Sequence, residues 1–256
     1  MIISNSLGQA YLDELLLQRA EKNYSAGLCL CCFATSCREQ EVLKFLHPEE
    51  IEYFRTLTFE KRKKSYLVGR YAAKQAIKIS SGEQNLHAIS IQPGIFNQPI
   101  TTCISEQNLQ VSISHCGEIG AGLAFPEAHP LAIDIEKVEA GRRELLESQL
   151  TQAEQKIMRE VFISYDRALA VAWTAKEALS KVLKTGLTTP VHIFEIENVK
   201  SEIDYTISFF HHFGQYKAIS FDAGIYVCSI VCPKNTEVAI GIPSIKRFFD
   251  VVAAEK

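Results

Sequence analysis

The segment "HPLAIDIEKVE", residues 129–139, contains the pattern on which the interpretation of the whole chain depends. From Leu131 onward, apolar residues alternate with Ala132, Asp134 and Glu136, as they do in a buried β-strand. Side chains two positions apart share one face of a strand, so both carboxylates project from the same face. Burying an ionised carboxylate is costly, and a like charge beside it adds to the cost. We therefore expect a site that compensates this charge.

Length and composition describe an ordinary soluble globular protein. The chain has 256 residues, of which 47% are hydrophobic and 22% charged, enough for one large domain or two small ones. A net charge of −3 does not indicate binding to nucleic acid or to an anionic membrane. No apolar run reaches the roughly 20 residues of a membrane span, and the N-terminus lacks the features of a signal peptide. We expect a cytoplasmic protein.

Four cysteines raise the alternative of a zinc site. Cys29, Cys31 and Cys32 lie in the apolar, strand-like run "GLCLCCFAT", residues 27–35, and Cys37 follows it. Their spacing does not match the usual pairs of zinc ligands, and no second pair follows. We interpret these cysteines as small hydrophobic residues of a strand.

The periodicity of apolar residues predicts a mixture of helices and short strands. Helices are predicted at residues 7–22, 47–57, 59–79 and 170–184. Strands are predicted at residues 29–34, 87–91, 110–114, 120–125, 131–136, 192–198, 205–211, 216–221, 225–232 and 238–243.

The same order of elements occurs twice, which suggests a duplicated unit. Residues 69–77 align with 175–183, and residues 131–138 align with 238–245. In the second alignment Gly241 and Pro243 take the positions of the two acids, so we infer that packing does not require acids there.

This duplication predicts the fold class and the domain boundary. We expect an α+β fold with two pseudo-symmetric halves, each a small, mainly antiparallel sheet packed on a long helix. The predicted halves are residues 1–128 and 129–256.

The helix motif "WTAKEALSK", residues 173–181, carries further charged residues. Glu177 and Lys181 form an i,i+4 pair, and an ordinary surface ion pair is the simplest interpretation of the motif alone. With the two strand acids, however, Glu177 completes a set of oxygen ligands suited to Mg²⁺. Lys176 and Lys181 can supply positive charge to phosphates. The combination indicates phosphoryl or phosphodiester chemistry, in which positioning and charge neutralisation carry most of the catalysis.

The two motifs together resemble the surfactin-synthetase-activating (Sfp) type of the 4′-phosphopantetheinyl transferase family. The family motifs G-[IV]-D-x-E and W-[STC]-x-K-E-[AS]-x-x-K correspond to "AIDIE", residues 132–136, and "WTAKEALSK". The segments "RKKSYLVGRYAAKQAI" and "VSISHCGEIGAGLAF" resemble two further family segments and occur in the family's order. The resemblance covers about residues 48–232 and implies the family's fold of two related halves.

The resemblance implies an enzyme of the holo-[acyl-carrier-protein] synthase type, which transfers 4′-phosphopantetheine from coenzyme A to a serine of an apo acyl or peptidyl carrier protein. Adenosine 3′,5′-bisphosphate leaves. Asp134, Glu136 and Glu177 would hold Mg²⁺, or Mn²⁺, on the pyrophosphate. Glu177 would also accept the serine proton, and Lys181 would stabilise pyrophosphate charge. Lys176 would help on the same face or pair with a carboxylate.

Other residues would bind coenzyme A, by the same resemblance. Ser114 and His115 lie in "SISH", where the family uses histidine near the 3′-phosphate. Arg70 matches a cleft arginine of the family and has either a coenzyme A role or a structural role. For the basic cluster at residues 62–64 we favour a solvated helix face over phosphate binding.

Three departures from the family pattern affect coenzyme A binding. Ala132 replaces a glycine before the metal strand, Gln98 stands where a lysine is common, and the stretch at residues 49–52 is acidic where basic residues are expected. These departures threaten affinity more than chemistry.

The resemblance also suggests the partner surface and the oligomeric state. The family docks an acidic carrier-protein helix on the C-terminal half, which here includes Lys184, Leu187, Phe209 and Phe210. The duplicated halves imply a monomer with internal two-fold pseudo-symmetry. A relative that binds coenzyme A or a carrier protein without transfer is the main alternative. An unrelated Mg²⁺-dependent phosphohydrolase would leave the "SISH" segment and the repeat unexplained.

Overall fold

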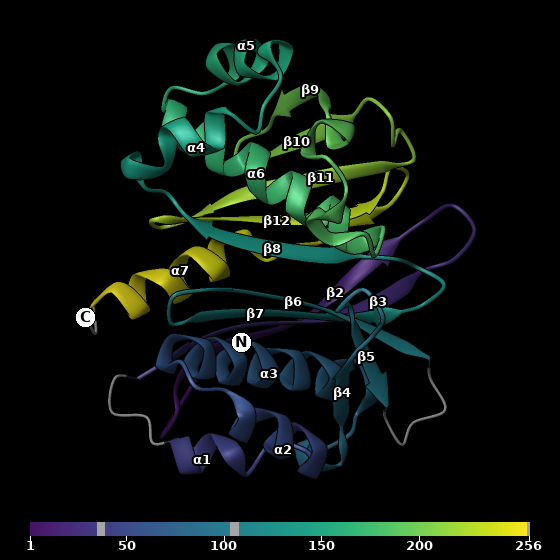
Figure 1. Cartoon of the computed structure of the whole chain (residues 1–256). Helices are drawn as coiled ribbons and strands as arrows, with labels where there is room; N and C mark the ends of the chain where they lie inside the picture. The colour runs from purple at the N-terminus through teal and green to yellow at the C-terminus, as the bar shows by residue number, and fades with distance from the viewer. Residues whose placement is uncertain (35–38, 103–107, 255–256) are drawn as a thin grey trace. The chain divides into compact units, whose positions relative to one another are not determined.

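The chain divides into two compact units in a computed structural model, which describes residues 1–34, 39–102 and 108–254 (Figure 1). The first unit comprises Met1–Pro130 together with the segment from Glu237 onward, and the second unit comprises Leu131–Thr236. Sequence predicted a boundary between residues 128 and 129, close to this division. It also predicted that the C-terminal segment would lie with the second half, whereas the structure groups that segment with the first.

The first unit is built on an antiparallel sheet with the strand order β1-β2-β3-β7-β6, and β13 pairs with β2. A separate hairpin joins β4 to β5. The strands of this unit are β1 (Ile2–Asn5), β2 (Gly8–Gln18), β3 (Tyr24–Phe33), β4 (Ser90–Pro93), β5 (Pro99–Thr102), β6 (Leu109–Cys116), β7 (Ile119–Pro126) and β13 (Glu237–Val238). Its helices are α1 (Glu39–Leu43), α2 (Pro48–Thr56), α3 (Glu60–Ser81), the 3-10 turn η1 (Leu86–Ala88) and α7 (Ile242–Ala254).

The long helix α3 packs closely on this sheet because the sheet offers glycines where the helix crosses it. A Cβ atom at Gly122 of β7 would lie 2.4 Å from the carbonyl of Ala72 in α3. Gly122 pairs with Cys29 of the neighbouring strand β3. Cys29 is therefore beside the helix contact, in the apolar core of the unit.

The predicted helix at residues 7–22 is wrong, because these residues form strand β2. Leu15 and Leu17 are buried whereas Glu14 and Leu16 are exposed, which is the two-residue period of a strand. Leucine, glutamate and glutamine favour helices locally. Pairing of β2 with both β1 and β3 overrides that preference.

The second unit contains an antiparallel sheet with the strand order β8-β12-β11-β10-β9, and α6 packs on β8, β11 and β12 (Figure 1). Its strands are β8 (Ala132–Lys137), β9 (Ile196–Ser201), β10 (Tyr205–Phe210), β11 (Tyr216–Ala223) and β12 (Tyr226–Pro233). Its helices are α4 (Arg143–Glu147), α5 (Gln152–Val161), α6 (Tyr165–Val182) and the 3-10 turns η2 (Ala140–Arg142), η3 (Gly186–Thr188) and η4 (Val191–Phe194). The α+β class, with antiparallel sheets and a long helix in each unit, is therefore confirmed.

In the second unit, hydroxyl groups lie at the contact between α6 and the sheet, whereas Gly122 lies at the corresponding contact of the first unit. The hydroxyls of Thr174 in α6 and Ser229 in β12 lie 2.6 Å apart and are both buried. Ser229 pairs with Asp134 of the neighbouring strand β8.

The predicted strand at residues 238–243 is wrong for most of its length. Only Glu237–Val238 pairs with β2, and α7 begins at Ile242. Gly241 and Pro243 are therefore not the counterparts of Asp134 and Glu136, and the alignment of residues 131–138 with 238–245 fails. A Gly-Ile-Pro sequence is also typical of a helix start, since proline is tolerated in the first turn.

Each unit contains a fully buried ion pair between a short helix and the long helix. In the first unit, Lys74 of α3 pairs with Glu50 of α2, with 2.6 Å between Nζ and Oε2. In the second, Lys176 of α6 pairs with Glu154 of α5, with 2.7 Å between Nζ and Oε1. We call these pairs the Glu–Lys braces. They align Lys74 with Lys176, which shifts the predicted alignment of the two long helices by one helical turn.

Both braces also close a capping box and hold a strand. The carboxylates of Glu50 and Glu154 accept the backbone N–H of their own helix N-cap residue. Each accepts a second backbone N–H, that of Ile91 in β4 or Ile196 in β9. Buried charges are tolerated when they are paired and hydrogen-bonded in this way.

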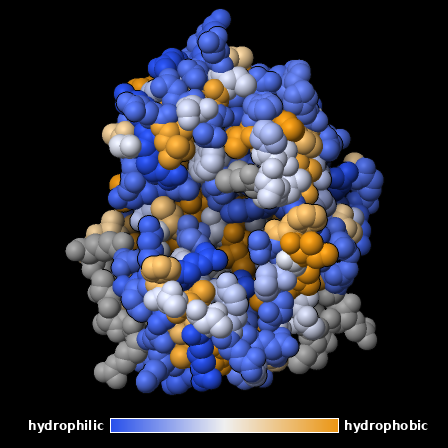
Figure 2. Space-filling view, viewed as in Figure 1, coloured by the Kyte–Doolittle hydropathy of each residue, from blue (hydrophilic) through white to orange (hydrophobic). Residues whose placement is uncertain are grey.

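The face of the molecule seen in Figure 2 is mostly hydrophilic, with small hydrophobic patches between polar side chains. Within the described residues, no helix combines the length and the apolar character needed to cross a bilayer.

Candidate active site

Strand β8 presents two carboxylates of the second unit, and helix α6 supplies the lysine that pairs with the first. Asp134 is 2% exposed, and its Oδ1 accepts a hydrogen bond from the Nζ of Lys181 at 2.7 Å. The same ammonium donates to the carbonyl of Ile133 at 3.1 Å. Strand and helix are therefore joined at this point by a charged contact.

The second strand carboxylate has an arginine as its partner. The guanidinium of Arg142, at the end of the turn η2, donates to Oε2 of Glu136 at 2.6 Å. Burial and the charge of Asp134 raise the pKa of Glu136, and Arg142 opposes that rise. Sequence reasoning missed Arg142; its position six residues after Glu136 was the available signal.

Glu177 of α6 is the most perturbed of the three carboxylates. Burial raises its pKa to about 7, and the charge of Asp134 adds to the rise. Lys181 lowers the pKa, Glu136 raises it further, and Arg142 lowers it. The three carboxylates and two cations therefore act on one another electrostatically, and we call them the carboxylate cluster. A carboxyl group with a pKa near 7 is suited to exchanging protons at neutral pH.

The donor set of the carboxylate cluster fits a hard divalent cation by its chemistry. Asp134 and Glu136 raise the pKa of Glu177 even though Lys181 and Arg142 lower it, so the three carboxylates repel one another. Mg²⁺ prefers carboxylate oxygens as ligands. Among the described residues, however, no three His, Cys, Asp or Glu side chains are arranged to hold a metal as they stand. Lys181 and Arg142 each donate a hydrogen bond to one of the three carboxylates, those of Asp134 and Glu136 respectively.

Lys176 lies apart from the carboxylate cluster, although it is in the same motif. Its side chain is 0% exposed, and its ammonium donates to Glu154 and to the carbonyl of Gln149. Burial lowers the pKa of Lys176, and Glu154 counteracts this effect. Of the two roles considered for Lys176, the structure shows pairing with a carboxylate.

Arg70 of α3 belongs to the brace of the first unit. Its Nε lies 3.4 Å from Oε1 of Glu50, and its guanidinium lies 4.8 Å from the ring centre of Tyr66. The side chain is only 14% exposed. These contacts match the structural role considered for Arg70.

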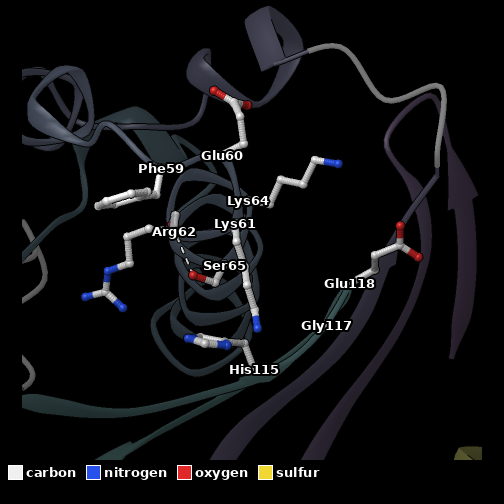
Figure 3. A pocket seen from close by; sticks show the side chains of 9 residues that line it. All are labelled: Phe59, Glu60, Lys61, Arg62, Lys64, Ser65, His115, Gly117 and Glu118. Atoms are coloured by element: carbon white, nitrogen blue, oxygen red, sulfur yellow. Dashed lines mark hydrogen bonds between the residues drawn. The ribbon is translucent and has the colours of Figure 1, made fainter.

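His115 lines a cavity of about 740 Å³ in the first unit (Figure 3). The cavity lies between the first turns of α3 and the β6–β7 turn, and its lining comprises Phe59, Glu60, Lys61, Arg62, Lys64, Ser65, His115, Gly117 and Glu118. Figure 3 shows the Lys61 side chain extending from α3 toward His115. Ser114, the neighbour of His115, is buried in β6.

The structure therefore groups basic residues that sequence analysis treated separately. Arg62 and Lys64 were interpreted as part of a solvated helix face, yet they line the same cavity as His115. Lys61 joins them there and was not singled out. A helix begins at this cavity, and helix N-termini also favour negative charge.

The three departures from the family pattern have structural explanations. Ala132 is fully buried in the core of the second unit, where its methyl group packs with apolar side chains. The side chain of Gln98 accepts a hydrogen bond from the N–H of Phe96 in the β4–β5 turn. In the acidic stretch, Glu50 forms the brace and Glu49 accepts a hydrogen bond from Ser90.

The four residues predicted for partner docking do not share one environment. Phe210 is buried in the core, whereas the ring centre of Phe209 lies 5.5 and 5.4 Å from the ammonium groups of Lys200 and Lys234. Lys184 is exposed. The side chain of Leu187 lies outside the described residues.

The cysteines for which a zinc site was considered as an alternative lie only partly within the described residues. Cys29, Cys31 and Cys32 are buried in β3, and Cys37 lies outside the described residues. Cys32 points to the opposite face of the strand from the other two.

Comparison with known proteins gives concordant matches. The model of the 4′-phosphopantetheinyl transferase superfamily matches residues 130–231. Holo-[acyl-carrier-protein] synthase of Mycoplasma mycoides subsp. mycoides SC is 31% identical over 97 residues, which are 36% of this chain and 82% of that protein.

Enterobactin synthase component D of Escherichia coli (strain K12) is 31% identical over 145 residues, 56% of this chain. The match spans 63% of that relative, somewhat less than two thirds of its length. A solved holo-(acyl-carrier-protein) synthase from Bacillus anthracis str. Ames covers 45% of this chain and 96% of its own at 18% identity. Its TM-score of 0.34 is too low to add to the sequence matches.

Proposed function

This chain belongs to the 4′-phosphopantetheinyl transferase superfamily, and we propose that it transfers the 4′-phosphopantetheine group of coenzyme A to a serine of an apo carrier protein. The observation that carries the proposal is the carboxylate cluster, in which Lys181 of α6 pairs with Asp134 of β8 and both charges act on Glu177. The serine oxygen bonds to the phosphorus that bears the pantetheine arm. The bond from that phosphorus to its bridging oxygen breaks, and adenosine 3′,5′-bisphosphate leaves.

The residues of the cluster have distinct proposed roles. Glu177 accepts the serine proton, for which a pKa of about 7 is suitable because a general base works best near the ambient pH. Lys181, already held beside Asp134, stabilises negative charge on the pyrophosphate. Mg²⁺ or Mn²⁺ bound by Asp134, Glu136 and Glu177 would neutralise charge on the attacked phosphate and on the leaving group.

The cavity around His115 is the proposed site for the phosphorylated nucleotide of coenzyme A. Lys61, Arg62 and Lys64 surround it with positive charge, although Glu60 and Glu118 also line it. Arginine and lysine at a helix N-terminus are well suited to phosphate oxygens. We therefore propose that the phosphate contacts are made at the start of α3.

The carrier-protein contact is proposed for the second unit. Phe209, with Lys200 and Lys234 beside its ring, offers apolar area and positive charge to an acidic helix. We propose that the chain acts as a monomer.

The transfer is tested by mass spectrometry of apo carrier proteins after incubation with the full chain, coenzyme A and Mg²⁺. Wild type should add the pantetheine arm to at least one carrier. Glu177→Gln should lower the rate by at least about 100-fold, the lower range for a positioned general base. Glu160→Gln is the matched control, because Glu160 is an exposed acid of α5 paired with Lys156.

Two results would contradict the proposal. Full activity of Glu177→Gln would exclude the assigned base. Binding of coenzyme A without transfer to any carrier would instead favour the non-enzymatic relative.

A further inference from the structure

Arg142 is a charged residue of the cluster that the proposed transfer does not use. It ends the turn η2, which follows strand β8 after two residues, and its guanidinium donates a hydrogen bond to Glu136 at 2.6 Å. The side chain is 30% exposed and that of Glu136 is 21% exposed, so the pair lies at the rim of the cluster. Its location suggests a role that depends on access from solvent.

The two cations of the cluster are anchored differently. Lys181, in the last turn of α6, donates to the carbonyl of Ile133 as well as to Asp134. Within the described residues, the guanidinium of Arg142 has Glu136 as its one hydrogen-bond acceptor. Arg142 can therefore leave its carboxylate at the loss of a single contact, whereas Lys181 cannot.

The neighbouring arginine shows that this pairing is specific to position 142. Arg143 turns away from the cluster and makes two hydrogen bonds to the carboxylate of Asp166. Its side chain is 52% exposed. Arg142, by contrast, is one of the charges that act on Glu177.

A divalent metal and a guanidinium compete for the same carboxylate oxygen. Metal binding at Glu136 therefore requires the guanidinium to leave, and the displaced positive charge then lies close to the metal. A pyrophosphate bound there would relieve this repulsion, because guanidinium groups pair well with phosphate oxygens.

We propose that Arg142 is a positioning residue that couples metal binding to coenzyme A binding. Its guanidinium holds Glu136 in the metal-free protein and transfers to the pyrophosphate when the metal takes that carboxylate. This inference rests on the proposed function, since it takes the pyrophosphate of coenzyme A as the acceptor. Linkage requires the effect to be reciprocal, so coenzyme A strengthens metal binding as much as the metal strengthens coenzyme A binding.

The test measures Mn²⁺ binding by the decrease of the free Mn²⁺ signal in electron paramagnetic resonance, with and without coenzyme A. In wild type, coenzyme A should tighten Mn²⁺ binding by about tenfold, within the usual range of coupling between sites. Arg142→Gln should bind Mn²⁺ about tenfold more tightly than wild type without coenzyme A, and coenzyme A should add little. Arg142→Lys should restore part of the coupling, and Arg143→Gln should behave as wild type.

Three results would overturn the inference. Equal Mn²⁺ affinity of Arg142→Gln and wild type without coenzyme A would overturn the inference, as would unchanged coupling in that variant. The same loss of coupling in Arg143→Gln would also overturn it, since the effect would not be specific to position 142.

The inference and the proposed function fail separately. If wild type transfers the pantetheine arm but the variants show no change in coupling, only the inference fails. If the Mn²⁺ coupling is found but no carrier is modified, only the proposed transfer fails. If Mn²⁺ binds to wild type in neither condition, both fail.

Discussion

The first and second units use the same brace to hold a long helix, but they surround it with different chemistry. Glu50 with Lys74 and Glu154 with Lys176 occupy equivalent places, each at the third position of a short helix and the middle of a long one. A buried ion pair of this kind is a structural feature, because both of its charges are enclosed and paired. Lys176 of the motif "WTAKEALSK" therefore has a structural role, because it forms the brace of the second unit.

Alignment on the braces identifies what replaces the cluster in the first unit. Ala72 then corresponds to Thr174, and strand pairing places Cys29 where the second unit has Asp134. The pairs that correspond are Cys29 with Asp134, Cys31 with Glu136, Gln75 with Glu177 and Ile79 with Lys181.

This comparison teaches that the scaffold itself does not require acids. Two buried cysteines and a neutral glutamine take the positions of the three carboxylates in a unit with the same brace. The inference that packing does not demand Asp134 and Glu136 therefore stands, but the internal control is strand β3 and not residues 238–245.

Removing the lysine of either brace tests whether the two units are equivalent. Lys74→Met and Lys176→Met should each lower the free energy of unfolding by about 3–5 kcal/mol, because each leaves a buried, unpaired carboxylate. Urea unfolding followed by circular dichroism measures both. Lys156→Met, at an exposed i,i+4 pair, is the control and should cost at most about 0.5 kcal/mol. A loss in only one of the units would contradict their equivalence.

A glycine-to-serine exchange tests the difference in helix–sheet contact. Gly122→Ser should destabilise by about 3 kcal/mol, since its Cβ would meet the backbone of α3. Ser229→Ala, at the equivalent position, should cost only about 1 kcal/mol through its lost hydroxyl contacts with Thr174 and Ser220. Thermal unfolding of the two variants makes the comparison. Similar losses for both would mean that the two contacts are equally close.

The carboxylate cluster should make stability fall as pH rises. Folded Glu177 keeps its proton up to about pH 7, whereas its ordinary pKa is 4.5. The folded state therefore binds more protons between these pH values, and the free energy of unfolding decreases as pH rises through them. Glu177→Gln places in the second unit the residue that the first unit has at Gln75. In this variant the free energy of unfolding should fall by about 1–3 kcal/mol less over this pH range than in wild type. Urea unfolding of wild type and Glu177→Gln from pH 4.5 to 7.5, in the presence of a chelator, measures this difference. The same pH dependence of the free energy of unfolding in both proteins would contradict the prediction.

The two helix caps should give the smallest effect. Thr151→Ala in the second unit should cost about 1 kcal/mol, because the hydroxyl accepts the N–H of Glu154 at 3.2 Å. His47→Ala in the first unit should cost less, about 0.5 kcal/mol, since its ring accepts from Glu49 at 3.4 Å. Thermal unfolding measures both; a larger loss at His47 would reverse the expected order.

Local sequence pattern predicted the elements whose burial follows their own periodicity. The helices at residues 47–57, 59–79 and 170–184 and the strand at 131–136 correspond to α2, α3, α6 and β8. Residues 7–22 failed because long-range pairing with β3 decided their structure, and pairing between distant segments is not visible in local propensity. The strand predicted at residues 238–243 was too long for a similar reason. Only Glu237 and Val238 pair with β2, and this pairing sets the length of β13.

The acids of the candidate site and Lys181 could be named from the sequence, but the contacts of the other cations could not. The spacing of Asp134 and Glu136 and the helix motif indicated the three carboxylates and Lys181, and the structure pairs Lys181 with Asp134. Lys176 and Arg70 could not be assigned, because their roles depend on Glu154 and Glu50, which lie on separate short helices. Arg142 depends on the path of a turn, which the pattern of apolar residues does not specify.

The central claim, that the acids of the second unit carry the chemistry, is tested most directly by one pair of variants. The transfer of the pantetheine arm to an apo carrier is measured by mass spectrometry for Asp134→Asn and for Cys29→Ala, its counterpart in the first unit. Asp134→Asn should lose nearly all transfer, whereas Cys29→Ala should keep the wild-type rate. Substantial transfer by Asp134→Asn, or its loss only in Cys29→Ala, would contradict the claim.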